Sequence, residues 1–110
     1  MKKAKKKKDI NAGLPQLPFG DKEFDLALCS HFLFLYSEQL TEKFHYDSIK
    51  ELCRVANNVR IFPVLELGSV KSRHLDSVMK GLQRDGYQVR LRKVAYEFQK
   101  GGNELLEITS

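Results

Sequence analysis

The residues best suited to chemistry in this chain are the consecutive Cys29, Ser30 and His31, which directly follow an apolar run. Histidine titrates near neutral pH, so His31 is a candidate catalytic base that orients or deprotonates a bound nucleophile. The alternative is a histidine that caps the end of a strand through hydrogen bonds. Ser30 can bond either a ligand or the backbone. Cys29 has no sequence neighbour that favours a thiolate, which indicates a buried apolar role over that of a nucleophile.

Other residues that could do chemistry are spaced less favourably. His45 and His74 lie 29 positions apart without cysteine or carboxylate ligands at the usual spacing, so no metal site is expected. The aromatic run in residues 31–36 favours core packing over a ligand pocket. Arg54 is expected to make a structural salt bridge. The sequence KGGN (residues 100–103) has no following helix to hold a phosphate, and its glycines predict a hairpin turn.

The positive charge of the chain is concentrated at its start. The net charge is +5, but six lysines lie in residues 1–8, and the remainder has 13 basic and 14 acidic residues, a net of −1. Residues 1–13 are expected to form a basic disordered tail before a single domain, residues 14–110. Such a tail either stays solvated or binds nucleic acid or anionic lipid through its charge. Any such binding is expected to be non-specific, because the tail lacks the aromatic and arginine residues of a specific site.

Composition also limits where the chain is expected to work. No stretch approaches the roughly 18 apolar residues of a membrane span, and no apolar segment follows the basic start as in a signal peptide. The two cysteines, Cys29 and Cys53, lack CxxC spacing and lie in apolar patterns. We therefore expect two buried, reduced thiols and a cytoplasmic protein without membrane contact.

The elements that must position these residues alternate along the chain. The apolar run Phe24–Ser30 is typical of a strand covered on both faces. A helix is predicted for Ser48–Ala56, where Ser48 and Glu51 have the spacing of a capping box. The next strand is predicted for Val59–Leu67, with an end or a bulge at Pro63.

The second half of the chain predicts a helix and a hairpin. Ser72 is placed to cap the helix, and Gly86 is placed to end it. Alternation from Tyr87 to Leu91 predicts a strand with a bulge or kink near Lys93, and the return strand is Glu104–Thr109. The order strand-helix-strand-helix-strand-strand indicates an α/β fold, with parallel strands that end in an antiparallel hairpin.

This order, with these residues, resembles the carboxyl-terminal half of a class I S-adenosylmethionine-dependent methyltransferase domain. LPFGDKEFDLALCSHFLF (17–34) is similar to the segment through the family's fourth strand, written LPF-x-(D/E)-x-x-FD. IKELCRVANNVRIFPVLEL (49–67) is similar to the following helix and fifth strand, with the family's E-x-x-R-V. LQRDGYQVRLRKVAYEFQKGGNELLEI (82–108) is similar to the last helix and hairpin. The resemblance covers residues 14–109.

The resemblance implies a partial Rossmann-like sheet, S-adenosyl-L-methionine as cofactor and methyl transfer by in-line displacement, to which the protein contributes orientation. It places Cys29, Ser30 and His31 just past the fourth strand, near the methionyl end of the cofactor and the methyl acceptor. These three residues are therefore the expected cofactor contacts, with His31 as the expected catalytic residue. The acceptor itself is not specified.

The chain departs from the family in one important respect. The family binds its cofactor mainly through a glycine-rich turn in its first half, and this chain has no GxGxG sequence. A truncated methyltransferase domain that is inactive alone is therefore expected. One alternative is an enzyme that is active only with a second chain, and another is a non-enzymatic module with a lysine-rich tail. Without a neighbouring first strand, Phe24–Ser30 is expected to be an exposed edge that self-associates or pairs with a partner.

Overall fold

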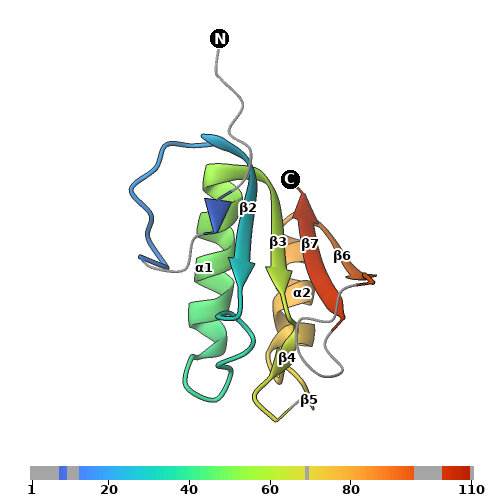
Figure 1. The fold of residues 1–110 in the computed structure, drawn as a ribbon. Coiled ribbons are helices and arrows are strands. Elements are labelled where there is room, and N and C mark those ends of the chain that lie inside the picture. Colours follow the sequence, from blue (N-terminus) through green and yellow to red (C-terminus); the bar gives the residue numbers. More distant parts are fainter. Residues whose placement is uncertain (1–7, 10–12, 69, 96–102, 110) are drawn as a thin grey trace.

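In the computed structural model, which describes residues 8–9, 13–68, 70–95 and 103–109, two helices separate three groups of strands along the chain (Figure 1). The elements are β1 (Lys8–Asp9), β2 (Phe24–Ser30), α1 (Glu42–Val55), β3 (Ala56–Phe62), β4 (Leu65–Glu66), β5 (Val70–Lys71), α2 (Leu75–Arg84), β6 (Gln88–Lys93) and β7 (Glu104–Thr109).

Five of these strands form one mixed sheet in the order β1-β2-β3-β7-β6. Strands β1, β2 and β3 are parallel, and β7 lies antiparallel between β3 and β6. The predicted parallel pairing of the first two main strands is confirmed, with Phe24 beside Ala56 and Ser30 beside Phe62. The predicted antiparallel hairpin is also confirmed for β6 and β7. Its turn, residues 96–102, lies outside the described residues.

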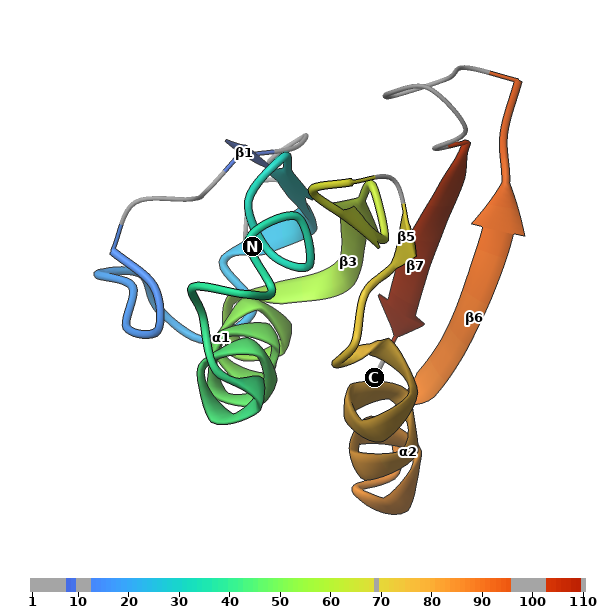
Figure 2. The same cartoon turned by 90° about the horizontal axis from the view of Figure 1, so that it is seen from below.

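Both helices cover the same face of the sheet, as Figure 2 shows. The strand residues on that face are fully buried: Ala27, Cys29, Val59, Ile61, Leu106 and Ile108. No described helix covers the other face, where Leu26 and Leu28 are only half-buried. The expectation that Phe24–Ser30 is covered on both faces is therefore wrong for the part of the chain that the structure describes.

The first helix begins earlier than predicted. Thr41 caps α1, because its hydroxyl oxygen accepts a hydrogen bond from the Phe44 amide at 3.0 Å. Ser48, the predicted cap, lies buried inside the helix. The capping-box prediction was wrong because a Ser-x-x-Glu spacing also fits an ordinary helical turn, and here Glu51 bonds Arg54 and Leu17 instead of the Ser48 amide.

The second helix and the strands near it agree more closely with the predictions. Gly86 has a φ of 97° just after α2, as predicted for a left-handed end. Ser72 bonds the amide of His74 and so lies two residues before the actual N-cap, which is His74. Strand β3 ends at Phe62, next to Pro63 as predicted, and a small antiparallel pair, β4 and β5, follows.

The sheet also includes part of the expected tail. Lys8 and Asp9 pair with Ala27 and Leu28, so residues 8–9 form a strand where a disordered segment was expected. Residues 1–7 and 10–12 lie outside the described residues. Among the described residues, β1 thus pairs with the outer edge of β2 at two positions.

Close packing of the two helices leads to a testable prediction. A β-carbon on Gly81 would lie 3.0 Å from Cε1 of Tyr46 in α1, closer than ordinary packing allows. Gly81→Val is expected to lower the free energy of unfolding by about 1–3 kcal/mol in urea denaturation, because it overpacks this contact. Gln83→Val on the exposed side of the same helix is the matched control, with an expected change within about 0.5 kcal/mol. Equal effects of the two variants would contradict close packing at Gly81.

Candidate functional site

The predicted site residues lie at the carboxyl end of β2, where β3 also ends. The amide of His31 donates to the Phe62 carbonyl at 2.8 Å, and the His31 ring stands edge-on to the Phe62 ring at 6.2 Å. His31 is exposed and has a φ of 56°, which is uncommon outside glycine. Ser30 is half-buried on the face of the sheet that no described helix covers, which also carries Leu26 and Leu28; we call it the open face. The structure therefore brings Ser30, His31 and Phe62 together at one edge.

Cys29 is separated from this group. It alternates with Ser30 along β2, lies on the helix-covered face and is fully buried. Cys53 is buried as well, and burial raises the pKa of its thiol to about 12. Both buried thiols agree with the sequence prediction. In this arrangement Cys29 packs in the core, away from the edge.

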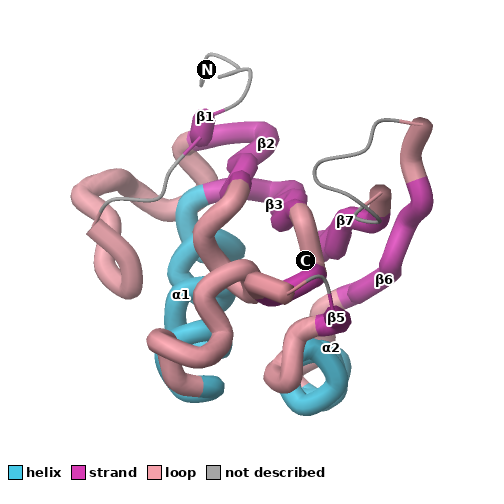
Figure 3. The backbone as a smooth tube through the Cα atoms, turned by 60° about the horizontal axis from the view of Figure 1, so that its bottom comes forward, coloured by secondary structure: helices cyan, strands magenta, loops and turns pink. Residues whose placement is uncertain are grey.

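A neutral histidine holds the loop that follows β2, which Figure 3 shows running to the start of α1. Nε2 of His45 accepts a hydrogen bond from the Phe34 amide at 2.9 Å, and Nδ1 donates to the Thr41 carbonyl at 2.8 Å. Only the neutral Nδ1–H tautomer satisfies both contacts. Burial lowers the pKa of His45 from 6.5, and the nearby His74 lowers it further, while the bond to Thr41 raises it.

A second histidine continues this network. Nε2 of His74 donates to the carbonyls of Ser37 and Leu40, each at 3.0 Å. The Ser37 hydroxyl donates to the Phe34 carbonyl and therefore accepts a hydrogen bond from the Ser72 hydroxyl. The Ser72 oxygen in turn accepts a hydrogen bond from the His74 amide. The rings of His45 and His74 lie 4.9 Å apart. Sequence reasoning missed this pair because the two residues lie far apart along the chain.

The histidine pair has a structural role in the described chain. The ring nitrogens of the two histidines bond backbone groups of the loop, from Phe34 to the N-cap Thr41. Among the described residues, no three histidine, cysteine, aspartate or glutamate side chains lie close enough together to hold a metal ion. The network therefore fixes the loop next to His31.

An ion pair supports the far side of the same edge. Glu66 is 5% exposed and binds Arg73 through the Arg73 amide at 2.6 Å and through Nη2 at 2.7 Å. The bonds from Arg73 lower the pKa of the Glu66 carboxyl. The amide of Leu67 donates to the Leu35 carbonyl at 3.0 Å, which joins the loop after β2 to the β4–β5 hairpin.

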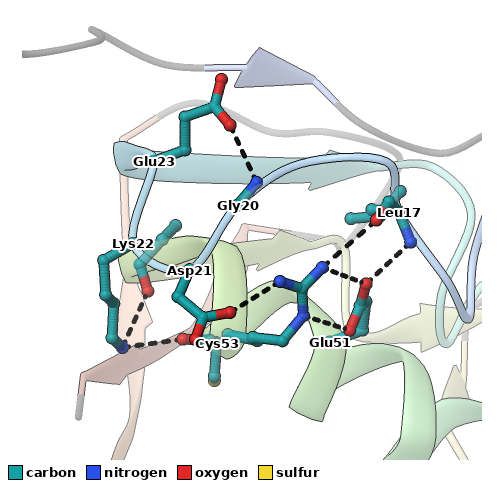
Figure 4. A network of polar contacts seen from close by, with 9 residues as sticks. Leu17, Gly20, Asp21, Lys22, Glu23, Glu51 and Cys53 are labelled. Carbon is teal, nitrogen blue, oxygen red and sulfur yellow. Dashed lines mark hydrogen bonds and ion pairs between the residues drawn. The ribbon is translucent and has the colours of Figure 1, made fainter.

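At the opposite end of β2, Arg54 attaches the segment that enters the strand to α1, and Figure 4 shows its partners Leu17, Asp21 and Glu51. Its guanidinium binds Asp21 at 2.7 Å, both carboxylate oxygens of Glu51 at 2.8 and 2.9 Å, and the Leu17 carbonyl at 3.2 Å. Glu51 in turn accepts from the Leu17 amide at 2.7 Å. The predicted structural salt bridge of Arg54 is confirmed. Arg54 lowers the pKa of Glu51, while burial raises it.

Comparison with known proteins shows a similarity to a longer archaeal protein. The chain is 42% identical over 106 residues to the uncharacterized protein MJ0045 of Methanocaldococcus jannaschii. The match covers 96% of this chain and 46% of that protein, so the chain spans about half the length of the relative. No protein-family model and no solved structure matches the chain.

Among the described residues, neither helix has the length and the apolar character needed to cross a bilayer.

The neutral tautomer of His45 makes stability depend on pH. The unfolded chain takes up a proton near pH 6.5, whereas folded His45 resists protonation because its pKa is lowered. The stability that neutral His45 contributes is therefore complete above pH 6.5 and is lost as the pH falls toward the folded pKa. Between pH 6.5 and about 5, the free energy of unfolding of the native chain is expected to fall more than that of His45→Gln. Urea denaturation at several pH values measures the difference, and identical pH profiles would show that His45 is not held neutral.

Burial of the two thiols predicts that they react slowly with thiol reagents in the folded state. A rise in the Cys53 pKa from 9 to about 12 lowers its thiolate fraction roughly a thousandfold. A thiol reagent such as Ellman's reagent is expected to react on the order of a thousandfold more slowly with Cys53 in the native than in the unfolded chain, and Cys29 is also expected to be protected. In the unfolded chain, the reagent should react with both thiols. Rapid native reaction of Cys29, tested in Cys53→Ala, would place Cys29 at the accessible edge instead of in the core.

Proposed function

We propose that this chain forms the carboxyl-terminal side of an S-adenosylmethionine-dependent methyltransferase domain and supplies the acceptor side of its site. The observation that carries the proposal is the strand order β2-β3-β7-β6, with a parallel first pair and a reversed last strand between β3 and β6. The class I methyltransferase sheet that the sequence resembles has its fourth and fifth strands side by side and ends in such a hairpin. The partial Rossmann-like sheet belongs to this proposal.

The contacts of Arg54 support the same assignment. The segment similar to LPF-x-(D/E)-x-x-FD contributes Leu17 and Asp21, and the segment similar to E-x-x-R-V contributes Glu51 and Arg54. These two segments bind each other directly through the ion pairs and hydrogen bonds of Arg54 and Glu51. The residues that carry the resemblance thus form one structural unit at the start of β2.

The groups at the carboxyl edge fit one side of a cofactor and acceptor site. Ligands of open α/β sheets bind beyond the carboxyl ends of the strands, where Ser30 and His31 lie. His31 has an exposed ring and a backbone conformation of the kind that strained functional positions adopt. Cys29 does not fit this role because it is fully buried on the other face. The proposal therefore keeps Ser30 and His31 and gives Cys29 a packing role.

The chemistry assigned to these residues is orientation. When bound, S-adenosylmethionine supplies an electrophilic methyl group. His31 accepts a proton from the acceptor at a ring nitrogen or holds the acceptor by a hydrogen bond, and Ser30 hydrogen-bonds the bound molecule. The Phe62 carbonyl fixes the His31 backbone, and the neutral His45 fixes the loop beyond it.

The 110 residues contain no GxGxG sequence, and we propose that cofactor binding requires residues outside them. The alternative form of the proposal is a competent enzyme assembled from this chain and a second chain. The edge of β2 favours this alternative, because β1 covers it at only two positions in the described chain. A partner that adds a strand to this edge would complete the sheet.

Calorimetric titration with S-adenosylmethionine tests the proposal. The chain alone is expected to bind weakly or not at all, whereas a complex with the remaining part of the longer Methanocaldococcus jannaschii relative is expected to bind. In that complex His31→Ala should weaken binding by about tenfold, the value of roughly one hydrogen bond, and the exposed loop variant Glu38→Ala should not change it. A stable complex that does not bind the cofactor would refute the proposal.

A further inference from the structure

The open face of the sheet carries three arginines that the proposed methyl transfer does not use. Arg60 lies on β3, and Arg90 and Arg92 lie on β6; we call these three residues the arginine face. We propose that the arginine face binds single-stranded nucleic acid through its phosphates. This proposal does not depend on cofactor binding, because its phosphate contacts come from arginines on the sheet surface.

The strand register gathers the three side chains. Glu107 of β7 pairs with Arg60 on one side and with Arg90 on the other, so all three residues project from the same face. Nη1 of Arg92 and Nε of Arg60 each lie 3.3 Å from the same Glu107 oxygen. One carboxylate therefore pairs with two of the guanidinium groups, and Arg90 is its register neighbour on β6, so the three arginines and Glu107 keep an excess of two positive charges.

Arg90 is the residue of the cluster best placed to bind a ligand. It is exposed, and among the described residues it makes no ion pair. It borders a hollow of about 310 Å³ that is also lined by Gln88, Val89, Glu107 and Thr109. Arg90 and Arg92 are two positions apart on one strand and so lie roughly 7 Å apart on the same face. Guanidinium groups in such a row can bind successive phosphates, because each donates two parallel hydrogen bonds.

Aromatic rings beside this face favour a single strand over a duplex. Phe62 lies two positions after Arg60 on β3, and the exposed ring of His31 stands against it. Open sheets that combine rings with cationic side chains bind single-stranded nucleic acid, because bases stack on the rings while phosphates bind the cations. Both helices lie on the other face of the sheet, and no helix of the described residues covers this side (Figure 2).

Fluorescence anisotropy with a labelled oligothymidylate of about 12 nucleotides, over a series of salt concentrations, tests the proposal. In the full chain, Arg90→Gln with Arg92→Gln is expected to weaken binding about tenfold. The slope of log K against log salt should fall by about 1.4, which corresponds to two lost phosphate contacts of a single strand. Arg90→Gln alone should lower the slope by about 0.7, and it removes no ion pair that the described structure contains.

Two further variants separate a site from a simple effect of net charge. Lys80→Gln with Arg84→Gln removes the same charge from α2 and is expected to leave the affinity and the slope unchanged. Arg90→Lys with Arg92→Lys keeps the charge and is expected to keep the slope. Unchanged binding by the Arg90 and Arg92 glutamine variants, or an equal loss in the α2 variant, would overturn the proposal and leave the lysine-rich start of the chain or the overall charge as the source of binding.

Discussion

The parallel pairing of β2 with β3 is the constraint on which the rest of the described structure depends. The two strands run side by side from Phe24 and Ala56 to Ser30 and Phe62, and α1 makes the connection between them. Parallel pairing requires such a crossover, which buries one face of both strands under the helix. It also brings the ends of both strands to the same edge, so that the loop after Ser30 lies beside the residues that follow Phe62.

Polar contacts then decide how the two ends of β2 are held. At the start of the strand, Arg54 binds the incoming segment through two acidic side chains and a backbone carbonyl. At the end, His45 is kept neutral by burial and satisfies one amide and one carbonyl of the loop and helix. Buried polar groups are stabilising only when they are paired, and both sets of contacts meet this condition. The position of His31 follows from them.

The two faces of the sheet are suited to different tasks. The helix-covered face contains Cys29, Ile61, Leu106 and Ile108, which are fully buried and supply the core. The open face carries half-buried leucines near β2 and charged residues on β3, β7 and β6. The proposed methyltransferase role uses the carboxyl edge between these faces, and the proposed nucleic-acid role uses the charged part of the open face. The two roles share His31, whose ring stands against Phe62 at the carboxyl edge, whereas the three arginines serve only the second role.

The sequence by itself determined the order of the two helices and the four longer strands, the bounds of β2 and β7, the hairpin pairing and the structural role of Arg54. These features follow from local patterns, because apolar runs, alternation and glycine positions act over a few residues. Only the tertiary structure decided that Thr41 and not Ser48 caps α1, that His45 meets His74, and that Arg60 joins Arg90 and Arg92. A capping spacing also fits a helix interior, and the other two groupings join residues from separate elements. Their proximity depends on β7 lying between β3 and β6 and on the loop packing against α2, which no local pattern encodes.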